Sequence, residues 1–197
     1  MELVLASNNP GKAEELSGLL AALGIRVIPQ SQFSTPAAEE TGQTFIENAL
    51  IKARNAAAYS GRPALADDSG LCVDALGGSP GVISARYAGV DADDAANRER
   101  LLRELGDSEE RSARFVCLMV CLTGPHDPLP LIAQGEWAGE IATAARGDGG
   151  FGYDPVFIPR GDTRTAAELP PEEKNRQSHR GQALAALRER LPQLLQS

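Results

Sequence analysis

Residues 7–12, Ser-Asn-Asn-Pro-Gly-Lys, have the side chains expected where a loop turns into a helix that binds an anion. Asn9 suits the N-cap and Pro10 the first helical position, so Lys12 is predicted in the first turn. A lysine there costs about 0.3 to 1 kcal/mol against the helix dipole unless an anion bridges the ammonium and the free backbone N–H groups. The loop favours phosphate binding over an ordinary turn, although it lacks the Walker A spacing.

Asp67 and Asp68 are adjacent carboxylates at the predicted end of a short apolar strand. Burial and mutual repulsion oppose their ionisation unless a cation holds them. With oxygen ligands and a phosphate substrate, Mg²⁺ is the expected cation, since it binds one or two carboxylates together with water and phosphate. Glu39 and Glu40, in the preceding loop, are candidates for a further oxygen ligand. The alternative is that the aspartate pair only forms a turn.

Two segments towards the C-terminus have side chains suited to a planar ligand. Residues 147–154, Gly-Asp-Gly-Gly-Phe-Gly-Tyr-Asp, place Phe151 among glycines, where its ring can either stack on a base or cover the core. Ser178 is predicted to cap the last helix, which puts His179 and Arg180 in its first turn. Two basic residues at a helix start require a negative or carbonyl partner. A surface histidine is the simpler interpretation of His179 alone.

The charge balance restricts the class of ligand. A net charge of -8 opposes binding of a nucleic-acid polymer, whose affinity depends on many lysines and arginines. A small polyanion can still bind in a locally basic cleft. The 19 basic residues include only three lysines, Lys12, Lys52 and Lys174. We infer that lysine is kept where a compact, mobile ammonium is needed and arginine cannot replace it, with codon usage as the alternative explanation.

Length and hydropathy predict one domain over residues 1–197, with 42% hydrophobic residues. No stretch approaches the roughly 20 apolar residues of a membrane span, and the start lacks a basic leader. We therefore expect a cytoplasmic protein that binds no membrane. Of the three cysteines, Cys117 and Cys121 share an apolar run without metal-site spacing, so the cysteines are expected to be reduced core residues.

The pattern of apolar residues predicts an α/β fold in which helices flank a central mixed sheet. A capping box at Thr44 and Glu47 predicts a helix to about Tyr59. Its polar stripe contains Asn48, Lys52 and Asn55, and such stripes are usually solvated. The expected strands are 3–6, 25–29, 64–66, one from 71, 114–122 and 131–137; the expected helices are 10–23, 45–59, 94–105 and one from 178, with a loop over 30–42.

Taken together, these segments resemble the inosine triphosphate pyrophosphatase family, which acts on non-canonical purine nucleoside triphosphates. The resemblance covers essentially the whole chain. The matching segments are residues 7–12, Thr-Phe-Ile-Glu-Asn-Ala at 44–49 with Lys52, Ala-Asp-Asp-Ser-Gly-Leu at 66–71, Leu-Gly-Gly-Ser-Pro-Gly at 76–81, Ser-Ala-Arg-Tyr at 84–87, Gly-Phe-Gly-Tyr-Asp-Pro at 150–155, Ala-Glu-Leu at 167–169, Glu-Glu-Lys-Asn at 172–175 and Ser-His-Arg-Gly at 178–181.

This resemblance implies cleavage of ITP, dITP or XTP between the α and β phosphates, a requirement for Mg²⁺, a homodimer, and two lobes around a substrate cleft. Asp68 is implied as proton acceptor and metal ligand. Whether Glu39 or Glu40 also reaches the metal is left open. The implied substrate contacts are Ser7, Asn8, Asn9, Pro10, Gly11, Lys12, Lys52, Ser69, Phe151, Gly152, Tyr153, Asp154, Lys174, His179 and Arg180.

Three other functions are alternatives to the hydrolysis of non-canonical purine nucleotides. A non-catalytic nucleotide sensor would use the same phosphate loop to regulate a partner. A septum-associated nucleotide pyrophosphatase would act on pyrimidine or methylated nucleotides, whereas the Ser-His-Arg and Phe-Gly-Tyr-Asp segments favour purines. A phosphatase with an aspartyl nucleophile is disfavoured because the first strand ends in Ser7-Asn8-Asn9 and lacks a DxD motif.

Overall fold

The computed structural model describes residues 2–188 and 190–194 of the chain. Its strands form one six-stranded sheet in the order β2-β1-β3-β4-β5-β6. β1 pairs in parallel with β2 and with β3, whereas β5 and β6 are antiparallel, so the sheet is mixed as predicted. The strands are β1 (Glu2–Leu5), β2 (Arg26–Pro29), β3 (Ala64–Val73), β4 (Ser112–Leu122), β5 (Leu131–Ile141) and β6 (Phe157–Pro159).

The described part of the chain also contains six α-helices and several 3₁₀ helices. The α-helices are α1 (Pro10–Ala21), α2 (Phe45–Ser60), α3 (Asp94–Leu105), α4 (Pro171–Gln177), α5 (His179–Leu187) and α6 (Leu191–Leu194). The 3₁₀ helices are η1 (Gln30–Phe33), η2 (Asp74–Leu76), η3 (Gly81–Arg86), η4 (Asp154–Val156) and η5 (Ala166–Glu168). No helix of the described residues is long and apolar enough to cross a membrane.

The chain forms two compact units, and β3, β4 and β5 contribute residues to both. Unit 1 comprises the described residues of Met1–Asp68, Cys117–Gly135 and Arg180–Ser197. Unit 2 comprises Ser69–Val116 and Glu136–His179.

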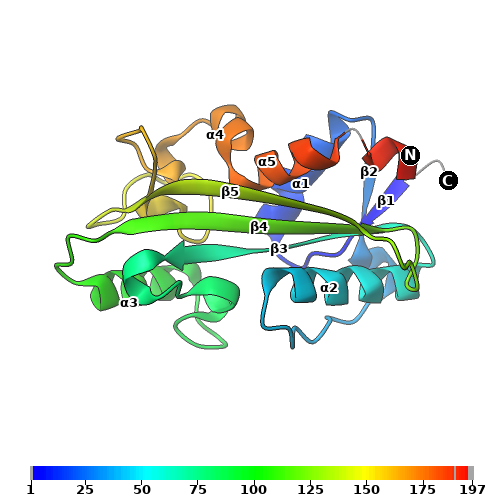
Figure 1. Ribbon diagram of the computed structural model, residues 1–197, viewed down its shortest axis with the longest axis horizontal. Coiled ribbons are helices and arrows are strands. Elements are labelled where there is room, and N and C mark those ends of the chain that lie inside the picture. Colours follow the sequence, from blue (N-terminus) through cyan, green and yellow to red (C-terminus); the bar gives the residue numbers. More distant parts are fainter. Residues whose placement is uncertain (1, 189, 195–197) are drawn as a thin grey trace. The chain divides into compact units, whose positions relative to one another are not determined.

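Helices cover both faces of the strands of unit 1 (Figure 1), and each face buries a separate apolar cluster. On one face, α1 and α5 pack against leucines such as Leu65. On the other face, α2 presents alanines to the sheet, among them Ala53, which is fully buried with Ala64 and Ala66. Small side chains on both partners allow α2 to lie close to the strands.

Unit 2 has an aromatic core. The rings of Phe115, Trp137 and Phe157 pack against one another and are all buried. Phe157 has its centroid 4.7 Å from that of Phe115 and 5.3 Å from that of Trp137. Leu101 and Leu105 contribute the buried face of α3 to the same cluster. Offset and tilted aromatic pairs of this kind add to the energy of area burial.

The structure corrects the prediction at β3. The sequence predicts one strand at 64–66 and another from 71, with the two aspartates at a strand end. β3 instead runs without interruption from Ala64 to Val73, so both aspartates lie within a strand. Ser69-Gly70 resembles a turn signal, but Gly70 is buried in the sheet, where its neighbours determine its conformation.

Other differences concern the ends of elements and short elements. β5 continues to Ile141, η1 occupies part of the predicted loop 30–42, and α4 and β6 were not predicted. α4 begins at Pro171, which follows another proline. A Pro-Pro pair usually interrupts regular secondary structure. A proline is favoured at the first position of a helix, however, and Pro171 lies at that position.

Replacing Thr44 tests the local origin of α2. Thr44 Oγ1 accepts a hydrogen bond from the Glu47 N–H, and Glu47 accepts one from the Thr44 N–H. Thr44→Ala is expected to lower the free energy of unfolding by about 1 kcal/mol, because the orphan N–H groups of the first turn lose their acceptor. Urea denaturation measures this change. Thr163→Ala, at an exposed loop threonine, is the control; equal losses in the two variants would contradict the capping role.

Candidate active site

The loop between β1 and α1 adopts the predicted capping arrangement. Asn9 Oδ1 accepts a hydrogen bond from the Lys12 N–H at 3.0 Å, and Pro10 opens the helix. Asn8 accepts a hydrogen bond from the Gln30 side chain at 2.8 Å, which ties the loop to η1. Ser7 accepts a weaker bond from the Asn9 N–H at 3.3 Å. Lys12 therefore lies in the first turn of α1, as expected, and this turn contains no acidic residue.

The counter-charge of Lys12 is Asp67 of β3. Lys12 Nζ lies 3.2 Å from Asp67 Oδ2, and the same oxygen lies 3.5 Å from Nε of Arg180 on α5. Arg180 also donates to Glu15 of α1 at 2.8 Å. These four residues form a buried network of two cations and two carboxylates, which we call the Asp67 network. The conflict between Lys12 and the helix dipole is thus reduced by a protein carboxylate.

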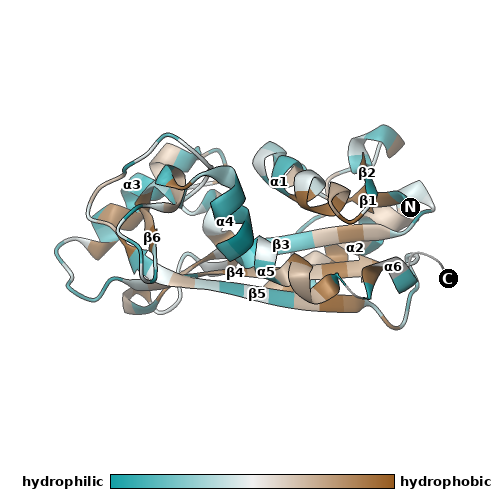
Figure 2. Cartoon of the chain, turned by 90° about the horizontal axis from the view of Figure 1, so that it is seen from above, coloured by the Kyte–Doolittle hydropathy of each residue, from teal (hydrophilic) through white to brown (hydrophobic). Residues whose placement is uncertain are grey.

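Asp67 and Asp68 contact different basic side chains. Successive side chains of a strand point to opposite faces, so Asp67 follows Leu65 onto the α1 and α5 face. Asp68 follows Ala66 onto the α2 face. Figure 2 shows that the hydrophobic start of β3 is followed by a hydrophilic segment, which contains both aspartates. Each carboxylate therefore has its own contacting partners. The two carboxylates repel each other less than their adjacent positions in the sequence suggest.

The two carboxyl groups differ in protonation equilibrium as a result. Burial by itself would raise the pKa of Asp67, but Lys12 and Arg180 outweigh it and hold that pKa well below its usual range. Asp67 is therefore a permanently ionised partner for two cations. Burial raises the pKa of Asp68, and Lys52 only partly opposes this shift. An aspartate with a raised pKa is better suited to accept a proton than its depressed neighbour is.

Asp68 lies beside Lys52 and the acidic loop. Lys52 Nζ donates to Asp68 Oδ1 at 2.7 Å and lies 3.6 Å from Glu40 Oε1. Burial lowers the pKa of Lys52, but Asp68, Asp67 and Glu40 raise it by more, so the ammonium stays charged. Asp68 Oδ2 is buried and has no hydrogen-bond partner among the described residues. Of the two candidate glutamates, Glu40 reaches this group, whereas Glu39 is exposed.

The polar stripe of α2 positions the acidic loop and is not simply solvated. Asn48 is fully buried and accepts a hydrogen bond from the Gly42 N–H at 2.8 Å. Two turns further along α2, Asn55 donates to the Pro36 carbonyl, also at 2.8 Å. These contacts hold the loop on both sides of Glu40. A β-carbon at Gly42 would lie 2.7 Å from Asn48 Oδ1, so the close approach requires glycine.

The glycine-rich loop of unit 2 forms a second charged cluster. Asp154 Oδ2 accepts hydrogen bonds from the Phe151 N–H and from Lys174 Nζ, both at 2.8 Å. Lys174 Nζ also lies 4.9 Å from the centroid of the Phe151 ring, a cation–π distance. Tyr153 is buried and donates its hydroxyl to the Ser84 carbonyl at 2.8 Å. Phe151 and Lys174 are thus fixed relative to each other, while the Tyr153 ring belongs to the core.

The remaining predicted substrate contacts are His179, Arg180 and Ser69. His179 and Arg180 occupy the first turn of α5, as predicted, and both are buried. The His179 ring stacks on Phe115 with centroids 4.8 Å apart and planes 8° from parallel. Ser69 follows Asp68 in β3 and is half-buried. The structure therefore places Lys12, Lys52, Asp67, Asp68 and Arg180 together in unit 1, and Phe151, Tyr153, Asp154 and Lys174 together in unit 2.

All three lysines of the chain pair with an aspartate. Lys12 lies against Asp67, Lys52 against Asp68, and Lys174 against Asp154, with side chains that are 16, 15 and 8% exposed. The inference that lysine is kept where a compact ammonium is needed stays a prediction. Glu15 was not predicted as a member of the site. It is 165 residues from Arg180 in sequence, and no local pattern connects the two.

The residues around Asp68 fit a magnesium ion that is bound together with a substrate. No group of three or more metal-binding side chains occurs among the residues that the structure describes. Mg²⁺, however, retains water and binds one or two carboxylates plus phosphate oxygens. The buried Oδ2 of Asp68 and the nearby Glu40 meet that requirement. The arrangement does not fit a cage made of protein ligands only.

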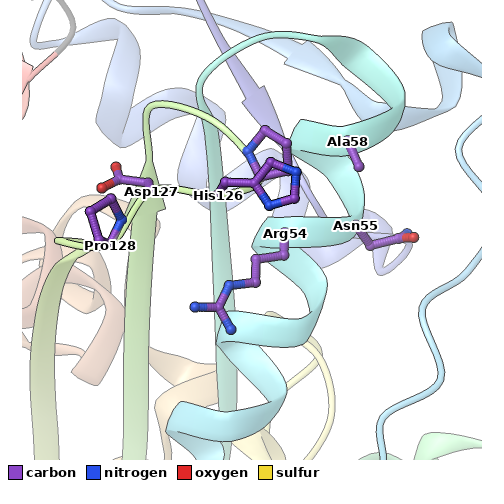
Figure 3. A pocket seen from close by; sticks show the side chains of 7 residues that line it. Arg54, Asn55, Ala58, His126, Asp127 and Pro128 are labelled. Carbon is purple, nitrogen blue, oxygen red and sulfur yellow. The ribbon is translucent and has the colours of Figure 1, made fainter.

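A separate surface hollow of about 650 Å³ lies between α2 and the turn after β4 (Figure 3). Figure 3 shows Arg54, Asn55 and Ala58 on the helix opposite residues 126–128 of the turn. Asp127 is already bound by the backbone N–H groups of Thr123 and Leu129. None of the predicted substrate-binding residues lines this hollow.

Comparison with known proteins identifies relatives over nearly the full length. The model of the Ham1 family matches residues 3–190. The dITP/XTP pyrophosphatase of Thioalkalivibrio sulfidiphilus is 59% identical over 194 residues, which cover 97% of this chain and 98% of that protein. The corresponding protein of Ralstonia nicotianae is 57% identical over 96% of both chains.

Solved structures agree with this result. A Ham1 protein from Coxiella burnetii has a TM-score of 0.90 and 53% identity, with 98% of this chain and 99% of that chain covered. The Ham1 protein of Staphylococcus aureus has a TM-score of 0.85 and 42% identity, with the same coverage. The expected family and the mixed α/β fold are thereby confirmed.

Removing the charge of Asp67 tests the buried network. Asp67→Asn removes the carboxylate that contacts Lys12 and leaves Arg180 with Glu15. The free energy of unfolding at pH 7 is therefore expected to fall by about 3 to 5 kcal/mol. The folded-state pKa of Asp67 is depressed, so its stabilisation is complete above the unfolded pKa near 3.9 and declines below it.

The measurement is urea unfolding of both proteins between pH 7 and pH 3. The difference between wild type and Asp67→Asn is expected to shrink as the pH falls below about 4. Asp107→Asn, at an exposed position, serves as control and is expected to change stability by less than about 0.5 kcal/mol. A penalty of constant size across the whole pH range would show that the charge of Asp67 is not what stabilises the network.

Proposed function

Because this chain belongs to the Ham1 family, we propose that it hydrolyses non-canonical purine nucleoside triphosphates, namely ITP, dITP and XTP, to the monophosphate and pyrophosphate. The observation that carries the proposal is Asp68, a buried carboxylate that contacts Lys52 and keeps one oxygen without a partner among the described residues. The relatives named dITP/XTP pyrophosphatase support the choice of substrate.

In the proposed mechanism, the ammonium groups of Lys12 and Lys52 bind phosphate oxygens of the substrate. Both already lie within 3.2 Å of a carboxylate oxygen, so they are oriented before a substrate arrives. Asp68 orients a water molecule and accepts its proton as the water attacks the α phosphorus in line.

Mg²⁺ is the proposed cofactor, with Asp68 and Glu40 as the residues that would hold it. When bound, the ion neutralises charge that develops on the phosphate oxygens. Asn48 and Asn55 support Glu40 by holding both sides of its loop on α2. Glu39 is exposed and is the weaker of the two candidates.

Selectivity is proposed to depend on the six-position of the purine. Hypoxanthine and xanthine present a carbonyl oxygen there, whereas adenine presents an amino group. Hydrogen-bond donors at His179, Arg180 and nearby backbone would pair with the oxygen only, and Phe151 would stack on the ring. An unpaired buried donor costs about 1 to 3 kcal/mol, enough for roughly tenfold discrimination or more per contact. Arg180 is already engaged by Glu15 and Asp67, so its base contact rests on the family resemblance.

We also propose that the protein acts as a homodimer on the cytoplasmic nucleotide pool. The resemblance to the family supports the dimer, and the nucleotide substrates named for the relatives support the compartment. Light scattering coupled to size-exclusion chromatography measures the mass in solution. A monomer of 197 residues at micromolar concentration would contradict the dimer.

Pyrophosphate release measured with ITP, dITP, XTP, GTP and ATP tests the proposed function. We expect rapid release of pyrophosphate from ITP, dITP and XTP with Mg²⁺, and release from ATP that is at least about tenfold slower. Chelation of Mg²⁺ is expected to abolish the activity. Equal rates of pyrophosphate release from all five nucleotides would contradict the proposed selectivity. Binding of ITP without any release of pyrophosphate would favour a nucleotide sensor.

Asp68→Asn tests the proton acceptor. The variant is expected to fold and to lose about 10² to 10⁴ in kcat, because asparagine cannot accept the proton. Asp74→Asn is a matched control, since Asp74 is an exposed aspartate next to the end of β3 whose carboxylate contacts Arg114. Circular dichroism and thermal melting establish that both variants are folded. Activity of Asp68→Asn near that of Asp74→Asn would refute the assignment.

A further inference from the structure

The glycine-rich loop of unit 2 is held from outside by two side chains of α3. Asp94 Oδ2 accepts a hydrogen bond from the Gly152 N–H at 2.7 Å. Arg98 Nη1 donates a hydrogen bond to the Gly152 carbonyl, also at 2.7 Å. Asp94 and Arg98 are four residues apart on α3, so their side chains lie on the same face of the helix. We call this pair the α3 clamp.

The α3 clamp fixes the backbone on both sides of Gly152. The N–H of Gly152 belongs to the peptide group that follows Phe151, and its carbonyl belongs to the peptide group that precedes Tyr153. Gly152 has a φ of 61°, in the left-handed region that a glycine adopts easily. A glycine with this freedom holds one conformation only if its neighbours impose it. The clamp supplies one acceptor and one donor for that purpose.

Phe151 is the residue whose direction depends most on this constraint. Its N–H donates to Asp154 Oδ2, and its ring lies under Lys174 Nζ. Tyr153, on the other side of Gly152, is anchored by its hydroxyl to Ser84. The segment is therefore held by contacts at Phe151, Gly152 and Tyr153. The hydrogen bonds that the structure describes for Gly152 are the two of the α3 clamp.

We propose that Asp94 and Arg98 are positioning residues that hold the Phe151 ring in the orientation needed to stack on the purine base. The inference rests on the proposed function, in which Phe151 contacts the base. Neither residue of the clamp is expected to touch the substrate, because each acts through the peptide groups of Gly152. The clamp therefore affects binding of the base and leaves binding of the phosphates unchanged.

The test compares a ligand with a base and a ligand without one. Asp94→Ala and Arg98→Gln are each assayed with ITP and Mg²⁺, and tripolyphosphate is used as a competitive inhibitor that lacks a base. The KM for ITP is expected to rise about five- to tenfold, with kcat within about twofold of wild type, because binding common to ground and transition states is lost. The inhibition constant of tripolyphosphate is expected to stay within about twofold.

Matched controls separate the clamp from a general effect on α3. Glu99→Ala and Arg103→Gln change exposed residues of the same helix and are expected to leave both constants unchanged. Arg98→Lys keeps a cationic donor and is expected to recover part of the lost affinity for ITP. Thermal melting shows whether each variant is folded.

The outcomes distinguish the inference from the function on which it rests. The positioning role would be overturned if both clamp variants had the wild-type KM for ITP. It would also be overturned if the KM for ITP and the inhibition constant of tripolyphosphate rose equally. In both cases the proposed function would still stand. Failure of the wild-type protein to release pyrophosphate from ITP would overturn the function, and the clamp proposal with it.

Discussion

The alternation of side chains along β3 is the constraint on which the site depends. It sends two aspartates that are adjacent in sequence to opposite faces of the strand, each to a different helix and a different set of cations. Asp67 joins Lys12 and Arg180, and its charge is fixed. Asp68 joins Lys52, and burial raises its pKa. Two identical side chains thus acquire different properties from position alone.

The helices on each face are matched to these carboxylates. On one face, α2 presents alanines to Ala64 and Ala66, so the helix lies close enough for Lys52 to reach Asp68. On the other face, α1 follows β1 after the short loop of residues 6–9, which places Lys12 near the middle of the neighbouring β3. Buried ions are tolerated here because each has a partner of opposite sign at 3.5 Å or less.

The parts of this arrangement that depend on local sequence could be predicted. The Asn9-Pro10 cap, the Thr44–Glu47 capping box and the position of Lys12 all follow from interactions within four residues. The continuity of β3 could not be predicted, because Ser69-Gly70 has the composition of a turn and only the neighbouring strands keep it extended. The contacts of Arg180 with Glu15, and of Gly152 with α3, join distant segments and have no local signal.

The pairing of every lysine with an aspartate has a practical consequence for chemical labelling. Amine-reactive reagents normally modify many surface lysines and give a mixed product. In this chain the exposed basic side chains are arginines such as Arg54, while the three lysine side chains are at most 16% exposed. Acylation of a lysine side chain would therefore take place inside an ion pair that the fold has built, and its rate would report how often that ion pair opens.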